Sequence, residues 1–248
     1  MKKTYRLFLI GVILCSLATS CKDKKDVVPI LPPSNSIAMD FSYFSLTKSE
    51  NKGLETTYFE AAAGIVQNWV PITKVVLDVP ISAFEALAAN DSKKQSLSNN
   101  TWQWKYTNDG HSVVVTAVVG SSTKWTFNVD GTDCITGTSD SKGTSGDWEL
   151  RDMTSENTPL LKVDWSSSNS SQTILSYTCL SGSYSGNTIM YSPEATSTTY
   201  SNTFEGKDGN DNYCIEWNPP VGGRVRSQAS FGNNEWHKWN ANKTNVIE

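Results

Sequence analysis

The spacing of apolar residues changes once along the chain, near residue 101. Before that point, apolar side chains recur every three or four positions, at Leu54, Tyr58, Ala62, Ile65 and Trp69. This spacing is typical of one face of a helix. Pro71 is expected to end or kink the helix, because proline removes an amide donor and crowds the carbonyl four residues back.

A second, shorter helix is predicted around residues 80–88. Pro80 occupies a first-turn position, where the missing N–H of proline costs little, and Ile81, Phe84 and Leu87 share one face. Residues 92–100 have no apolar pattern and are expected to form a loop. The helical part of the chain is therefore predicted at about residues 54–90.

From Thr101 onward apolar and polar residues alternate, which predicts strands with one buried face. The first two are expected around Trp102 and Val115, joined by a tight turn at Asn108-Asp109-Gly110. Further strands are expected around Trp125, Trp148, Val163, Tyr177, Ile189 and Ile215. The spacing of turn signals predicts about nine to eleven strands in a meander.

A sheet with one apolar face needs a cover, and the predicted helices precede it in the chain. The expected fold is mainly β: a curved antiparallel meander, or half-barrel, with one or two N-terminal helices packed on its concave face. The expected domain covers residues 39–248, with the sheet at about residues 101–240. Residues 22–38, charged and then proline-rich, are expected to form a flexible tether that begins at Cys21.

The first 21 residues have the pattern of an export signal. Three basic residues, Lys2, Lys3 and Arg6, precede an apolar run over residues 7–17, and small residues lead to Cys21. The run is too short to span a bilayer. The segment resembles the lipobox of bacterial lipoproteins, although the family usually has leucine where this chain has Ala18.

That resemblance implies removal of residues 1–20 and acylation of Cys21, with palmitate among the added lipids. It places the protein in the bacterial cell envelope, at the outer membrane, with the membrane as a partner through the lipid anchor. Surface display in such lipoproteins is associated with consecutive acids after the cysteine. Because Lys22 to Asp26 mix both signs, the choice between periplasm and exterior stays open.

The order of helices and strands resembles the half-barrel class of lipoprotein carriers, in which an apolar cavity holds acyl chains. The repeated tryptophans, including Trp102-Gln103-Trp104 and Trp236-His237-Lys238-Trp239, are similar to those of uncharacterised Bacteroidetes-type envelope lipoproteins. No activity comes with the second resemblance.

The charge of the chain argues against a nucleic-acid partner. The net charge is −4, and removal of the three basic residues of the signal makes it −7. A surface that follows phosphates needs clustered lysine and arginine, whereas the basic residues from Lys22 to Lys25 are interrupted by Asp23. No cofactor is expected.

Candidate catalytic groups are sparse. The two histidines are interpreted as a hairpin residue, His111, and a structural residue, His237. Glycoside hydrolysis would need two facing carboxylates, for which the candidates are Asp147, Glu149, Asp164 and Glu216. Strand alternation alone would place such acids on an exposed face, so the protein is predicted not to be an enzyme.

No metal site is expected. The loop from Asp208 to Asn212 offers several oxygen ligands but departs from the EF-hand pattern, and it is interpreted as a turn. Cys134, Cys179 and Cys214 lie outside any metal-binding spacing. Their odd number leaves at least one unpaired, and the sequence leaves open whether two of them form a disulfide.

All nine tryptophans lie after residue 21, and they offer either core or ligand surface. The candidates for ligand contact are Trp102, Trp104, Trp125, Trp236 and Trp239. The first functional hypothesis is a non-enzymatic lipoprotein that holds an apolar or amphiphilic ligand, such as a lipid, inside the half-barrel. The alternative is a glycan-binding or assembly-accessory lipoprotein that uses exposed aromatic residues. The sequence does not indicate the oligomeric state.

Overall fold

The computed structural model describes residues 26–45, 57–70, 77–154, 156–169, 172–193 and 199–247. The predicted signal, Cys21, Leu54 and Pro71 lie outside these residues. In the described part, no helix is both long and apolar enough to cross a membrane.

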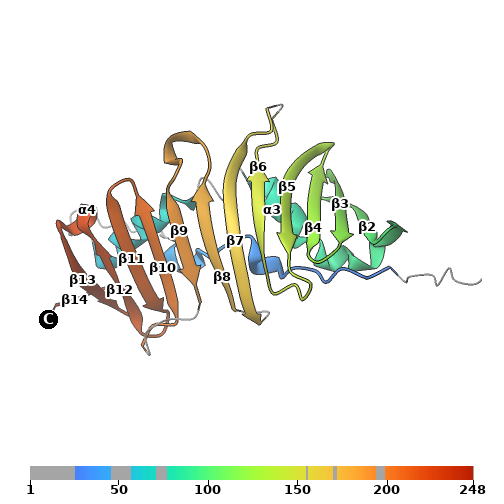
Figure 1. Ribbon diagram of the computed structural model, residues 1–248. Coiled ribbons are helices and arrows are strands. Elements are labelled where there is room, and N and C mark those ends of the chain that lie inside the picture. Colours follow the sequence, from blue (N-terminus) through green and yellow to red (C-terminus); the bar gives the residue numbers. More distant parts are fainter. Residues whose placement is uncertain are drawn as a thin grey trace, which may run out of the picture.

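The protein is built on one antiparallel sheet whose strand order follows the sequence from β1 to β14 (Figure 1). The strands are β1 (Gln95–Ser98), β2 (Thr101–Asn108), β3 (His111–Val119), β4 (Thr123–Val129), β5 (Thr132–Ser139), β6 (Ser145–Arg151), β7 (Pro159–Asn169), β8 (Gln172–Cys179), β9 (Thr188–Ser192), β10 (Asn202–Asp208), β11 (Asp211–Asn218), β12 (Gly222–Ser227), β13 (Asn233–Asn240) and β14 (Asn245–Val246). The strands β1 and β14 are the two edges, so the sheet is not closed. The predicted antiparallel meander is confirmed, but fourteen strands replace the expected nine to eleven.

The predicted hairpin turn after β2 is present. Asn108 pairs with His111, and the two residues between them have positive φ angles of 50° at Asp109 and 87° at Gly110. This geometry suits the right-handed twist of the two strands and is accessible to glycine and aspartate. Asp130-Gly131 makes the same kind of turn between β4 and β5.

Several strands escaped prediction because they carry few apolar residues on the covered face. All four residues of β1 are exposed, which corrects the loop expected there. On β5, Gly137 lies where a side chain would meet Trp148, since a Cβ at Gly137 would be 2.5 Å from the indole. A large ring on one strand thus fills the place of a missing side chain on the next.

Helix α2 (Tyr58–Gln67) packs against β12 and β13 on the covered face of the sheet. Its first turn is fixed by Thr57, which accepts from the Glu60 amide while the Glu60 carboxylate accepts from the Thr57 amide. The buried residues are Phe59, Ala62, Ala63 and Val66. The buried stripe is therefore offset from the predicted one, with Tyr58 and Ile65 half-buried at its margin.

Helix α3 (Asp78–Glu85) lies over β4, behind the middle strands in Figure 1. Pro80, Ala83 and Phe84 are buried, and Phe84 contacts the rings of Phe127 and Trp148. The remaining short elements are η1 (Ser34–Ser36), η2 (Ser42–Phe44), η4 (Ala88–Lys93), η5 (Gly182–Tyr184) and α4 (Gln228–Phe231).

Residues 26–45 belong to the folded unit, which corrects the tether expectation for residues 26–38; the first residues of the expected tether, 21–25, lie outside the described residues. Val27 bonds to Asn100 at the β1–β2 turn, and the main-chain carbonyl of Ile37 accepts from the Tyr177 hydroxyl at 2.6 Å. Ile37 is fully buried. The prolines that suggested a spacer lie in an extended segment that packs against the sheet.

The core is a layer of aromatic and aliphatic side chains between the sheet and its cover. Its largest fully buried members include Trp104, Trp125, Trp148, Tyr177 and Phe204. The predicted division of the sheet into an apolar face and a polar face is confirmed along β4, where Trp125, Phe127 and Val129 are buried and the intervening residues are not.

Candidate functional site

Three of the five candidate tryptophans are core residues. Trp104, Trp125 and Trp239 are buried, and each indole N–H has a partner: Asp91, the Ser139 hydroxyl and the Tyr43 hydroxyl. Their rings lie on the covered face of the sheet. The structure therefore assigns them to packing rather than to a ligand surface.

The other two candidates occupy different faces. Trp102 is half-buried on the covered side, and its indole donates to the Val27 carbonyl at 2.8 Å. Trp236 lies on the opposite face, where the guanidinium carbons of Arg224 and Arg226 stand 4.1 and 4.8 Å from its ring centre. Trp236 is the candidate that the structure leaves on the outer face.

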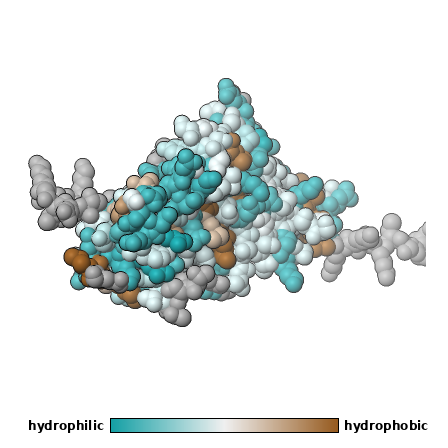
Figure 2. Space-filling view, turned by 60° about the vertical axis from the view of Figure 1, so that its left-hand side comes forward, coloured by the Kyte–Doolittle hydropathy of each residue, from teal (hydrophilic) through white to brown (hydrophobic). Residues whose placement is uncertain are grey.

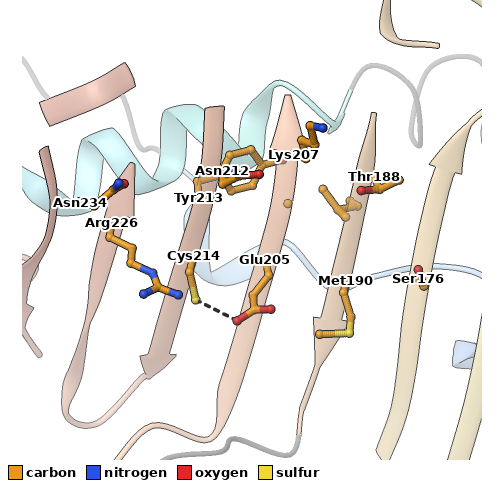
Figure 3. A pocket seen from close by; sticks show the side chains of 12 residues that line it. Ser176, Thr188, Met190, Glu205, Lys207, Asn212, Tyr213, Cys214, Arg226 and Asn234 are labelled. Atoms are coloured by element: carbon orange, nitrogen blue, oxygen red, sulfur yellow. Dashed lines mark hydrogen bonds between the residues drawn. The ribbon is translucent and has the colours of Figure 1, made fainter. Parts of the chain in front are cut away.

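That outer face carries a groove of about 530 Å³ near Trp236. Figure 3 shows the side chains that line it, which come from β8 to β13. They are Ser176, Thr188, Ile189, Met190, Glu205, Gly206, Lys207, Asn212, Tyr213, Cys214, Arg226 and Asn234.

Strand register explains the composition of the groove. Residues directly opposite one another form a row from Ser176 through Met190, Glu205 and Cys214 to Arg226. Because opposite residues of an antiparallel pair point to the same face, all five side chains project outward. Five consecutive strands thus bring together a hydroxyl, a thioether, a carboxylate, a thiol and a guanidinium.

The thiol of Cys214 is a structural partner of Glu205. Its sulfur donates to Glu205 Oε1 at 3.4 Å, and the two side chains point toward each other in Figure 3. Burial raises the pKa of Cys214 to about 12, and the Glu205 carboxylate adds to the shift. A thiol with that pKa stays protonated near neutral pH and is a poor nucleophile.

Arg226 presents a cation to the groove. Among the described residues no carboxylate lies within ion-pair distance of its guanidinium, whereas Arg224 on the same strand is bound to Glu216. The Trp236 ring lies 4.8 Å from the Arg226 guanidinium carbon, close enough for a cation–π attraction. Lys207 also lines the groove, so the charged lining comprises two cations and one carboxylate.

The carboxylates considered for glycoside hydrolysis lie elsewhere on the outer face. Asp147 and Asp164 are directly opposite, and Asp164 pairs with Lys162 at 2.8 Å. Glu149 pairs with Arg151, and Glu216 with Arg224. None of these four carboxylates lines the groove.

The histidines occupy the positions that the structural interpretation assigned to them. His111 Nδ1 lies 2.7 Å from the Asp130 carboxylate at neighbouring hairpins. His237 is stacked on Phe231, with ring centres 4.0 Å apart. In the described ranges no group of three or more histidine, cysteine or acidic residues is placed to hold a metal ion, and Cys134, Cys179 and Cys214 are free and buried.

Sequence reasoning missed Glu205, Arg226 and Met190. The available signal was the alternation Glu205-Gly206-Lys207 and Arg224-Val225-Arg226, which places charges on the outer face. Their convergence depends on strand register, which the sequence alone does not specify. Comparison with protein-family models, curated proteins and solved structures finds no match to the chain.

Proposed function

We propose that this protein is a non-enzymatic bacterial envelope lipoprotein that binds an acidic glycan in the outer groove. Its anchor is the acylated Cys21 and its site is the outer membrane, as the lipobox resemblance implies. The observation that carries the ligand proposal is the position of Arg226, a guanidinium in the groove with no carboxylate partner in the described structure.

A carbohydrate suits the mixture of groups in the groove. The lining offers hydrogen-bond acceptors and donors: the Glu205 carboxylate and the amides of Asn212 and Asn234. It also offers the hydroxyls of Ser176 and Thr188. The 40% exposed side chain of Met190 offers an apolar surface for the C–H face of a sugar ring. The groove is formed by strands rather than by long loops, so these groups are already in place before a ligand binds.

An acidic sugar is favoured over a neutral one by the charges. Arginine binds a carboxylate through two parallel N–H donors, which adds both strength and orientation. Arg226 and Lys207 supply such donors, and the Glu205 carboxylate can accept from sugar hydroxyls. The face of the molecule in Figure 2 has mainly hydrophilic and neutral residues, with separated hydrophobic patches.

The alternative, an apolar ligand inside a half-barrel, is less favoured. Rings already occupy the layer between sheet and helices: Trp104 and Trp125 have centres 5.9 Å apart, and Phe84 lies 5.0 Å from Trp148. A ligand there would have to displace packed side chains, at a cost of several kcal/mol.

The ligand proposal is tested on a glycan array with the chain from residue 21 onward carrying Cys21→Ser. Binding is expected to uronic or sialic acid glycans, and it is expected to fall about tenfold when the carboxylates are reduced to alcohols or when Arg226 becomes glutamine. Arg151→Gln, which alters an arginine outside the groove, is the matched control and should bind normally. An array without binders, or equal binding by the reduced glycans, contradicts the proposal.

The anchor is tested separately by growth with a palmitate analogue. Incorporation into the wild-type chain and its loss in Cys21→Ser are expected. Incorporation that survives this substitution would show that Cys21 is not the acylated residue.

A further inference from the structure

We propose that one corner of the sheet, at the β1–β2, β3–β4 and β5–β6 turns, rests on the lipid surface. The contact is made by five exposed aliphatic side chains, here called the rim patch: Val27, Val28, Ile30, Leu97 and Val118. The inference rests on the lipid anchor at Cys21 that is proposed above, and it concerns the opposite half of the sheet from the groove.

The rim patch is the main concentration of exposed apolar side chains in the described residues. Val27, Val28, Ile30, Leu97 and Val118 have exposed fractions of 56, 47, 53, 53 and 42%. They make up half of the ten large hydrophobic residues that are exposed there. Exposed apolar side chains gathered at one end of a domain commonly mark a contact with a partner or a membrane.

Hydrogen bonds fix the N-terminal part of the rim patch to the first strands. The Asp26 carboxylate accepts from the Ser96 hydroxyl at 2.5 Å, and the Val27 amide donates to Asn100 Oδ1 at 2.9 Å. Trp102 donates to the Val27 carbonyl. Leu97 lies between Ser96 and the β1–β2 turn, so Val27 and Leu97 are held at the same end of the sheet.

The rest of the rim patch lies along the same end. In an antiparallel meander alternate turns lie at the same end, which brings the β1–β2, β3–β4 and β5–β6 turns together. Val118 is next to the end of β3 and projects from the outer face, since its neighbour Ala117 is buried on the covered face, so it borders this end from the other side of the sheet. Ile30 lies against Gly143 of the β5–β6 turn, since a Cβ built at Gly143 would be 2.9 Å from Ile30 Cγ2.

The position of Cys21 in the sequence points to a lipid surface as the occupant. Only four residues, Lys22 to Lys25, separate Cys21 from Asp26, which is bound to the β1–β2 turn. Fully extended, that stretch spans no more than about 18 Å. An acylated Cys21 therefore holds this corner within reach of the headgroups.

The charges around the rim patch are compatible with anionic headgroups. Lysines contribute from the linking sequence and from two exposed positions nearby, Lys124 and Lys142. The five lysines outnumber the three acids at this end: Asp23, Asp26, which accepts from Ser96 and Asn100, and Asp140, which accepts from the amides of Lys142 and Thr144. The excess of lysines favours attraction to an anionic leaflet.

The experiment couples the chain from residue 21 onward, through its Cys21 thiol, to a maleimide lipid in phosphatidylethanolamine–phosphatidylglycerol vesicles. Coupling is selective because Cys134, Cys179 and Cys214 are buried. Amide hydrogen exchange is compared with that of the same chain capped by N-ethylmaleimide in solution. Exchange of residues 26–31 and 95–101 is expected to slow severalfold on the vesicles.

Two variants sharpen the test. Val28→Glu combined with Leu97→Glu should abolish the slowing. Tyr184→Glu should preserve it, because Tyr184 is 44% exposed in the β8–β9 connection, at the other end of the strands. Circular dichroism checks that each variant is folded.

Unchanged exchange at residues 26–31 and 95–101 overturns the inference, and so does slowing confined to other segments. Slowing that also appears in the capped chain as its concentration rises identifies a second copy as the occupant and likewise overturns it. The assay attaches the lipid chemically, so its failure leaves the natural acylation of Cys21 to be decided by palmitate labelling.

Discussion

Arg224 holds Glu216, its opposite neighbour across β11 and β12, through two nitrogens that each lie 2.6 Å from Glu216 Oε2. The carboxylate is almost fully buried, with a residue exposure of 6%. Rings of Tyr200 and Trp236 face the guanidinium at 5.3 and 4.1 Å. This ion pair on the polar face is therefore screened from water on several sides.

Arg224→Met is expected to lower the free energy of unfolding by about 3 kcal/mol, because it leaves the Glu216 carboxylate buried without its partner. Urea unfolding followed by tryptophan fluorescence gives the value. Lys162→Met is the matched control: it removes the partner of Asp164 in a pair whose side chains are about half exposed, and it should cost less than about 1 kcal/mol. Similar losses in both variants would contradict the assignment.

Thr203→Val is expected to stabilise the protein by about 1 kcal/mol. The Thr203 hydroxyl is buried and has no hydrogen-bond partner among the residues that the structure describes, and valine has the same shape without the polar group. Thr173→Val is the control, since the Thr173 hydroxyl donates to Asn35 Oδ1 at 2.9 Å and its removal should destabilise. Urea midpoints that shift in the same direction for both variants would show that the pairing of the hydroxyl is not the cause.

Gly223→Ala is expected to cost about 2 kcal/mol or more, because a Cβ there would lie 2.2 Å from the Trp239 ring and 2.6 Å from the Glu216 carbonyl oxygen. The same substitution at Gly64, inside α2, meets nothing within 4 Å. Gly64→Ala should therefore raise stability by about 1 kcal/mol through helix propensity. Thermal unfolding of both variants measures the contrast, and a neutral Gly223→Ala would show that β12 and β13 can separate without penalty.

Stability is expected to fall as the pH rises above about 9. Burial is the main reason that the pKa of Cys134 and of Cys214 is raised to about 12 and that of Cys179 to about 11. Because these folded-state values exceed the unfolded value, their stabilising contribution is complete below about pH 8.5 and is lost as the pH rises toward the folded values.

The slope for each thiol in this window is about 1.4 kcal/mol per pH unit. Cys214→Ala should therefore flatten the decline of the unfolding free energy between about pH 9 and about pH 10. Urea unfolding at several pH values measures it, with Cys179→Ala as a second case. A slope unchanged by both substitutions would mean that these thiols do not control the pH dependence.

Periodicity predicted the sheet well where large side chains mark the covered face. Trp102, Trp104 and Tyr106 define β2 in sequence and in structure. Prediction failed where a neighbouring ring replaces the side chain, as at Gly137 beneath Trp148 and Gly223 beneath Trp239. In the sequence alone these glycines are typical of loops, because the side chain that occupies the space beside each of them comes from another strand.

The candidate site was less accessible to prediction than the fold. Tryptophans were candidates for ligand contact because their rings offer a large apolar area. The same large apolar area favours burial in the core, where Trp104 and Trp125 lie. The groove depends on Glu205 lying beside Met190 and Cys214, and such pairings require register across separate hairpins. Likewise, prolines at positions 29, 32 and 33 indicated an extended segment correctly, but not that it would pack against the sheet.

Because residues 26–45 pack against the finished sheet, the order in which the domain folds is expected to differ from the order in which it is synthesised. Each strand pairs with its neighbours in sequence, so hairpins can assemble locally with small losses of loop entropy. The N-terminal segment instead bonds to the sheet and to the turn after β13 through partners 70 to 200 residues away, from Ser96 to Lys243. These contacts require both halves of the sheet. The part of the domain that is synthesised first is thus expected to become ordered last, and the aromatic layer stays partly open to water until it does.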